Sequence, residues 1–234
     1  MMRFPALLTA KLAKARIKRV FRPAHQGRLL AFADPAEILH AGSAHPVSHE
    51  KIRDAIGNPA PVIWVGGGEP LDHPGIAHFI RAIAPSGHYI FLETNGALLR
   101  RRIHELQPLP RVFLTVRLDA VRTPQSDLAA EGLRAAWLSG FFTVVHSVVC
   151  EDSNLAGLDR LRGLLLEMDV DGWLITAGST SAEVVRKASE ARTLVPSAAW
   201  RRFSEQVEHE LLTPSAPLRE KPPGENCEEG VKVA

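Results

Sequence analysis

The feature that most constrains the fold of this chain is a sixfold alternation of short apolar runs with helical segments between residues 27 and 212. The apolar runs have strand length and are apolar throughout rather than at every second position, as buried parallel strands are. The segments between them carry apolar residues at helical spacing. Strands that alternate with helices pair in parallel through right-handed crossovers. The pattern therefore predicts an α/β fold, as an open doubly wound sheet or as an incomplete barrel.

The approximate bounds of these elements follow from the same pattern. We expect strands over 27–34, 61–66, 88–94, 111–119, 141–149 and 171–178, and helices over 47–56, 74–84, 97–106, 127–139, 155–168, 182–191 and 199–212. Asp127 is the expected capping residue of its helix, which ends before Gly140. The chain then has three parts: a helix and linker over 1–26, the six-unit domain over 27–212, and a Pro-rich polar tail over 213–234, which we expect to be extended or mobile.

Unusual polar residues follow several of the expected strands. Three glycines, a glutamate and a proline come after the second strand (66–70), ETNG ends the third (93–96), and RLD ends the fourth (117–119). CEDSN and TAGSTS follow the fifth and sixth strands, whereas the loops at the opposite end have the composition of plain connectors. Ligands of both candidate folds bind at the carboxyl ends of the strands. The asymmetry therefore predicts a site at this rim.

The residue types at the rim suit a small zwitterionic ligand. Glycines leave backbone N–H and C=O groups open to close approach, and Glu69 can accept hydrogen bonds from an ammonium group. Asn95 offers a donor and an acceptor, and Asp119 can accept from ribose hydroxyls. A phosphate fits less well, because the GxxxxGK[ST] pattern is missing and Glu69 would repel it. A tight turn with Glu69 paired to an arginine explains the same residues, and the residues alone leave both interpretations open.

Five stretches, in matching order, resemble the radical S-adenosylmethionine superfamily. They are DPAEIL (34–39), VGGGEPLDHP (65–74), LETNGALL (92–99), VFLTVRLDAV (112–121) and DGWLITAG (171–178). Within the superfamily, the chain is most similar to the hopanoid-biosynthesis enzymes that attach an adenosyl group to a hopene. The resemblance covers roughly residues 5–205. It implies a partial (βα)6 barrel of the TIM type, preceded by an amphipathic helix.

The resemblance also implies a cofactor site. The GGEP segment of this superfamily contacts the methionine amino group of S-adenosylmethionine, which assigns that role here to Gly67, Gly68, Glu69 and Pro70. Polar residues at the ends of the fourth and fifth strands reach the ribose and carboxylate in the family, and the matching positions here are Arg117, Asp119 and His146.

The chain departs from the family at the cysteines. The family holds a [4Fe–4S] cluster with CxxxCxxC after the first strand, because the cluster irons need thiolate ligands. Residues 27–45 contain no cysteine, and the two cysteines of the chain, Cys150 and Cys227, cannot replace three clustered ligands. We therefore expect no [4Fe–4S] cluster and no reductive cleavage of S-adenosylmethionine. Four histidines lie near the segment where the family has its cluster cysteines: His40, His45, His49 and His73. They could bind zinc or iron, or could be incidental surface residues, and we assign no metal site.

Two functional interpretations fit this sequence. The first is a non-catalytic partner or regulator that can still bind S-adenosylmethionine or a related nucleoside, with a cluster-containing homologue as its protein partner. The alternative is an enzyme of hopanoid or lipid modification whose cluster or metal comes from a partner or from non-cysteine ligands. The net charge of +2 gives no reason to expect nucleic acid as a partner.

The first twenty residues have the pattern of a basic amphipathic helix. We expect Leu7, Leu8, Leu12 and Ile17 near one face, with lysines and arginines over much of the rest. Such a helix can lie on an anionic membrane surface, and a helix docked on its own domain fits the same pattern. No apolar run approaches the roughly 18 residues of a membrane span, and no secretory signal pattern opens the chain. We expect a cytoplasmic protein, with residues 1–20 as a candidate peripheral membrane contact.

Overall fold

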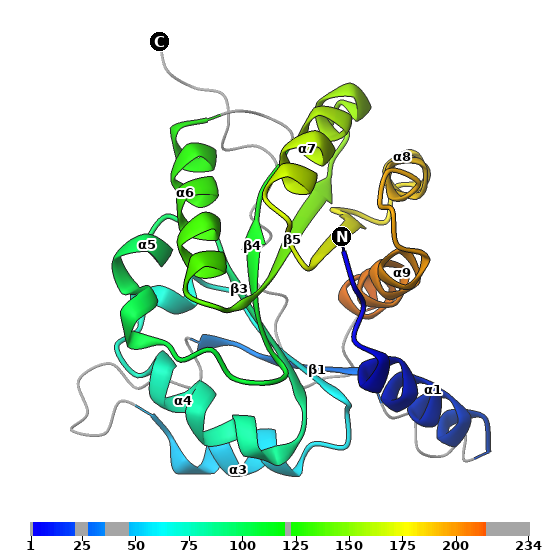
Figure 1. The fold of residues 1–234 in the computed structure, drawn as a ribbon. Helices are drawn as coiled ribbons and strands as arrows, with labels where there is room; N and C mark the ends of the chain where they lie inside the picture. Colours follow the sequence, from blue (N-terminus) through cyan, green and yellow to red (C-terminus); the bar gives the residue numbers. More distant parts are fainter. Residues whose placement is uncertain (1, 22–27, 36–46, 120–122, 214–234) are drawn as a thin grey trace.

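A six-stranded parallel sheet forms the centre of the computed structural model, which describes residues 2–21, 28–35, 47–119 and 123–213 (Figure 1). Its strands are β1 (Leu30–Ala33), β2 (Val62–Val65), β3 (Tyr89–Thr94), β4 (Val112–Arg117), β5 (Phe142–Val149) and β6 (Gly172–Ala177). The strands lie in the sheet in chain order, β1 to β6. A doubly wound sheet reverses its strand order at a switch point, and this sheet does not. The expected partial (βα)6 barrel is therefore confirmed.

Helices follow the strands as the alternating pattern predicts. Among the described residues, the α-helices are α1 (Ala6–Phe21), α3 (His49–Gly57), α4 (Ile76–Ile83), α5 (Leu99–Arg102), α6 (Pro124–Leu138), α7 (Leu155–Glu167), α8 (Ala182–Arg192) and α9 (Ala198–Leu212). Short 3₁₀ turns are η1 (Pro70–Asp72), η2 (Ala84–Ser86) and η3 (Ile103–Glu105). The expected linker between α1 and β1 and the expected tail after residue 213 lie largely outside the described residues.

Two helix boundaries differ from the sequence prediction. The helix expected over 97–106 is α5, a single turn, continued by η3. Helix α6 begins at Pro124 and not at Asp127. Thr123 and Ser126 form a capping box there, each side chain accepting the backbone N–H of the other residue, and proline suits the first helical position. Asp127 therefore lies in the first turn and is not the cap.

An aromatic stack fills the interior between the strands. The rings of Trp64 and Phe91 lie 5.6 Å apart and nearly parallel, and those of Phe91 and Phe113 are 4.9 Å apart. These residues stand side by side in the register of β2, β3 and β4. Flat rings at matching positions on neighbouring parallel strands bury large apolar areas together. The interior of the barrel beside β2, β3 and β4 is thus packed with side chains and not hollow.

Helix α9 fills the open side of the half-barrel. Two of its side chains accept hydrogen bonds from edge strand β6: Ser204 from the Ile175 N–H at 3.2 Å, and Glu208 from the Ala177 N–H at 2.6 Å. Glu210, near the end of the same helix, accepts the Leu29 N–H at 3.1 Å, just before β1. Side chains of one helix therefore accept hydrogen bonds from backbone donors at both edges of the sheet.

Helix α1 docks beside α9 with one of its faces (Figure 1). Leu8 and Leu12 are buried in the core, whereas Leu7 and Ile17 are exposed. The prediction that these four residues share one face is wrong. Successive residues turn by about 100° around a helix, which places Leu8 and Leu12 on a different side from Ile17.

Candidate functional site

The glycine loop after β2, Gly66–Gly68, crosses the carboxyl ends of the strands with little room beneath it. A Cβ on Gly66 would lie 2.9 Å from Oε2 of Glu93, and one on Gly67 would lie 3.2 Å from the carboxylate of Asp34. Gly67 also has φ of +122°, a conformation that favours glycine. Gly68 differs, because a Cβ there would meet no atom within 4 Å. Two glycines are thus required by the protein itself, and the third faces open space.

Glu69 ties this loop to the end of β3. Its Oε1 accepts the Leu71 N–H at 3.0 Å and the Thr94 hydroxyl at 2.6 Å, and its Oε2 accepts the Asn95 N–H at 2.8 Å. These partners are a hydroxyl and two backbone amides, not the arginine of the tight-turn interpretation. A carboxylate has about four acceptor positions, so Glu69 keeps room for roughly one further donor. Its main visible role is to hold the loop in shape.

The ETNG turn is also held by internal contacts. Asn95 Oδ1 accepts the Ala97 N–H at 2.9 Å, which leaves its amide nitrogen for a ligand. Gly96 has φ of +80°, and a Cβ there would lie 2.8 Å from the backbone of Ala129 in α6. Pro70 is buried at the start of η1. Of the expected cofactor residues on these two turns, Gly67 and Gly68 are exposed, Glu69 and Asn95 are partly exposed, and Pro70 is buried.

Asp119 lies at the end of β4, beside the last part of β5. Its Oδ1 accepts the Val148 N–H at 3.1 Å. The residue is exposed as a whole, yet protein atoms around the carboxyl group raise its pKa, against the opposing effects of the Val148 N–H and Arg117. The rim thus presents one carboxyl group at β4 in addition to the glycine loop at β2.

A row of buried polar side chains runs across the barrel below the rim, and the sequence analysis did not identify it. Glu93 on β3 accepts the Trp64 indole N–H at 3.0 Å with Oε2, and its Oε1 lies 2.5 Å from Nδ1 of His146 on β5. Nε2 of His146 lies 2.8 Å from the Thr176 hydroxyl on β6. The signal in the sequence was a glutamate and a histidine inside two otherwise apolar runs, HYIFLET and FFTVVHSVV.

Charge interactions and hydrogen bonds within this row stabilise the ionised form of Glu93. Burial alone would raise the pKa of Glu93, but the charge and hydrogen bond of His146, with contributions from Arg117 and Trp64, lower it below its usual value. Glu93 is therefore a carboxylate at neutral pH. It also lies directly beneath Gly66, so the row supports the glycine loop from inside the barrel.

The order carboxylate, imidazole, hydroxyl is also that of a hydrolytic triad. Here, however, the Thr176 residue is 1% exposed and His146 is 2% exposed. A substrate carbonyl could not reach a hydroxyl buried to that degree, so the row is structural. The same burial removes His146 from contact with a ligand, contrary to the role that the family resemblance implied for it.

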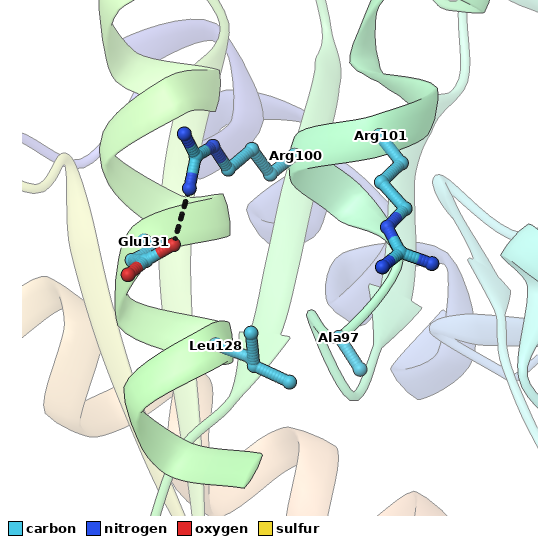
Figure 2. A pocket seen from close by; sticks show the side chains of 5 residues that line it. All are labelled: Ala97, Arg100, Arg101, Leu128 and Glu131. Atoms are coloured by element: carbon cyan, nitrogen blue, oxygen red, sulfur yellow. Dashed lines mark hydrogen bonds and ion pairs between the residues drawn. The ribbon is translucent and has the colours of Figure 1, made fainter. Parts of the chain in front are cut away.

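Two pockets lie outside the glycine loop. One of about 280 Å³ lies between α5 and α6, where Arg100 and Glu131 form an ion pair at 2.7 Å (Figure 2). Leu128 and Arg101 line it from the two sides. A second, of about 490 Å³, is lined by Arg81, Arg111 and the prolines that precede β3 and β4, at the opposite end of the barrel. Neither pocket includes the glycine loop.

Of the four histidines considered as metal ligands, the structure describes two. His49 opens α3 and His73 follows η1, while His40 and His45 lie outside the described residues. No group of three His, Cys, Asp or Glu side chains suitable for a metal occurs among the described residues.

The fold resembles that of solved enzyme structures. No protein-family model matches the chain, and no curated protein does. SuiB of Streptococcus suis bound to S-adenosylmethionine matches with a TM-score of 0.57 and 14% identity, over 77% of this chain and 51% of SuiB. SuiB bound to its precursor peptide SuiA gives the same TM-score. Archaeal TYW1 matches 81% of this chain and 64% of its own at 16% identity, with a TM-score of 0.43. The chain spans about half the length of the SuiB chains, and the likeness to them concerns the fold.

Proposed function

We propose that this chain binds S-adenosylmethionine, or a related nucleoside with an ammonium group, at the carboxyl rim of its barrel and does not cleave it reductively. The observation that carries the proposal is the glycine loop. The backbone groups of Gly67 and Gly68 make no hydrogen bond with other described residues, and Gly68 opens onto space that a side chain would fill. The fold shared with SuiB, solved with S-adenosylmethionine bound, supports the same ligand.

The rim residues suit this ligand in their chemistry. Carbonyl oxygens of the glycine loop and the remaining acceptor position of Glu69 suit a methionine ammonium group. Asp119, just after the end of β4, suits a ribose hydroxyl as an acceptor. Asn95 has a free side-chain amide nitrogen, which can donate to a carboxylate. The fit extends to S-adenosylmethionine and not to a [4Fe–4S] cluster, because three clustered thiolates are missing from the sequence.

The role that follows is that of a non-catalytic partner or regulator. In the superfamily that the chain resembles, the cluster supplies both the electron and part of the binding site. Without it, the remaining contacts bind the cofactor weakly. A cluster-containing homologue is the partner that we propose, and the likeness to hopanoid-biosynthesis enzymes makes lipid modification the proposed setting.

Binding of S-adenosylmethionine to a Gly68→Leu variant tests the proposal. The added side chain would project into open space, so the fold should be unaffected while the ligand is excluded. The matched control is Gly163→Leu, because a Cβ on Gly163 in α7 also meets no atom within 4 Å. Titration calorimetry should show binding to the wild type and to the control, and a loss of about tenfold or more for Gly68→Leu.

Glu69→Ala is a weaker test, because it removes the ligand contact and also unties the loop from β3. Comparing S-adenosylmethionine with adenosine adds a second arm, since the ammonium contact predicts that adenosine binds more weakly. Equal affinity of Gly68→Leu and wild type would place any binding elsewhere on the chain, and no binding to the wild type would remove the proposal.

A further inference from the structure

Helix α1 has two apolar sides, and docking on the barrel accounts for only one of them. Leu8 and Leu12 are buried in the core, and Phe4 just before the helix packs edge-on against Trp200 and Phe203 of α9. Leu7, Ile17 and Phe21 remain 67%, 58% and 79% exposed. Three large apolar side chains on one 16-residue helix thus have no part in its docking.

These exposed residues share a face with cations. At about 100° per residue, an arc of roughly 100° contains six residues, which we call the outer face of α1: Leu7, Ala10, Lys14, Ile17, Lys18 and Phe21. All six are exposed. The first acidic residue of the chain is Asp34, so the helix itself carries no negative charge. Figure 1 shows α1 at the edge of the molecule, beside α9 and away from α4 to α7.

We propose that the outer face of α1 binds an anionic lipid bilayer, with the helix lying in the plane of the interface. Interfacial helices have this composition: apolar side chains that enter the acyl boundary, and lysines beside them that meet anionic headgroups. The helix is about 24 Å long, enough to place residues from Leu7 to Phe21 on the surface together. Among the described residues, no helix is long and apolar enough to cross a bilayer.

Charge and apolarity together favour a bilayer over the other occupants. A second copy of the chain would bring the same lysines against one another. A nucleic acid would use the lysines but leave the leucine, isoleucine and phenylalanine exposed to water. Around the helix, Lys11 donates to the Gly87 carbonyl, and the nearby Arg111 adds positive potential on that side. This inference is independent of ligand binding at the rim.

Flotation of the full chain with vesicles tests it. The protein should float with vesicles of phosphatidylcholine and phosphatidylglycerol, and much less with phosphatidylcholine alone. The variant Leu7→Ser/Ile17→Ser/Phe21→Ser should lose about tenfold or more of this binding, because interfacial affinity scales with the apolar area inserted. Lys14→Gln/Lys18→Gln should weaken binding to the anionic vesicles and reduce its dependence on salt.

The matched control replaces three exposed apolar residues on other elements: Leu138→Ser/Phe142→Ser/Leu166→Ser, where the exposed fractions are 71%, 45% and 48%. It should float as the wild type does, and thermal melting should show that both triple variants remain folded. Wild-type protein that stays unbound with anionic vesicles overturns the proposal, as does equal flotation of the two triple variants. Binding to DNA or polyglutamate that depends on Lys14 and Lys18, without flotation, overturns it in favour of a polyanion.

Discussion

At the scale of single residues, the GGEP segment combines structural and ligand-facing roles that a motif cannot separate. Glu69 resembles a ligand contact in the sequence, yet in the structure it accepts three hydrogen bonds, from Leu71, Thr94 and Asn95. Gly66 and Gly67 are glycines because Glu93 and Asp34 lie directly against them. At Gly68, in contrast, no contact with the described protein requires a glycine. It is therefore the residue whose substitution reports on a ligand.

The buried Glu93–His146 pair predicts a pH-dependent stability. Because the pKa of Glu93 is lower in the folded state than its unfolded value of about 4.3, its stabilisation is fully present above that pH and is lost as the pH falls below it. Glu93→Gln should cost about 1.5–3 kcal/mol at pH 7, the range for a hydrogen bond to a charged group. Urea unfolding at several pH values should show the two proteins converging in acid.

Glu131→Gln is the control for that measurement. Its ion pair with Arg100 is largely exposed, so its loss should change the free energy of unfolding by less than about 0.5 kcal/mol at any pH. A Glu93→Gln protein as stable as the wild type at pH 7 would show that the row from Trp64 to Thr176 does not stabilise the barrel.

At the scale of elements, α9 takes the place that further strands would have in a closed barrel. Its buried Glu208 accepts the Ala177 N–H of β6 and pairs with Arg192 of α8 at 2.9 Å. Glu208→Gln would leave the Arg192 charge buried without a counter-charge. We expect a loss of about 3–5 kcal/mol in the free energy of unfolding. Amide hydrogen exchange should show reduced protection of β6, whose edge α9 covers.

The exposed pair of Arg186 and Glu190 on α8 provides the comparison. Its side chains are 61% and 47% exposed, so Glu190→Gln should cost less than about 0.5 kcal/mol. If Glu208→Gln were as mild as Glu190→Gln, the closing role of α9 would rest on its apolar contacts, such as Phe203 with Phe91, and not on the ion pair.

The elements were predictable from the sequence because their signals are local. Strands buried on both sides are continuous apolar runs, and all six lie within the expected ranges. The features that were mispredicted or missed depend on how residues lie relative to one another. The two sides of α1 could be separated only by assigning each leucine its angle around the helix. The Glu93–His146 contact joins strands that are not neighbours, so no local spacing reveals it.

At the scale of the whole molecule, the site was only partly predictable. The sequence located Gly67, Gly68, Glu69, Pro70, Asn95 and Asp119 at one rim, and the structure places all of them at or just beyond the carboxyl ends of β2, β3 and β4. Which of them are available to a ligand depends on hydrogen bonds with other residues, such as the one that the Thr94 hydroxyl donates to Glu69. Whether S-adenosylmethionine binds there stays a prediction.

The cysteine content of the whole chain predicts its iron chemistry. Its 234 residues contain two cysteines, and radical cleavage of S-adenosylmethionine depends on a cluster held by three neighbouring thiolates in the superfamily that the chain resembles. After anaerobic incubation with iron and sulfide, the purified chain should show no cluster absorption and, with a reductant, form no 5′-deoxyadenosine. Adding a cluster-containing homologue should leave the iron with the homologue. A cluster and 5′-deoxyadenosine formed by this chain alone would show that other side chains bind the iron, and the non-catalytic role would be wrong.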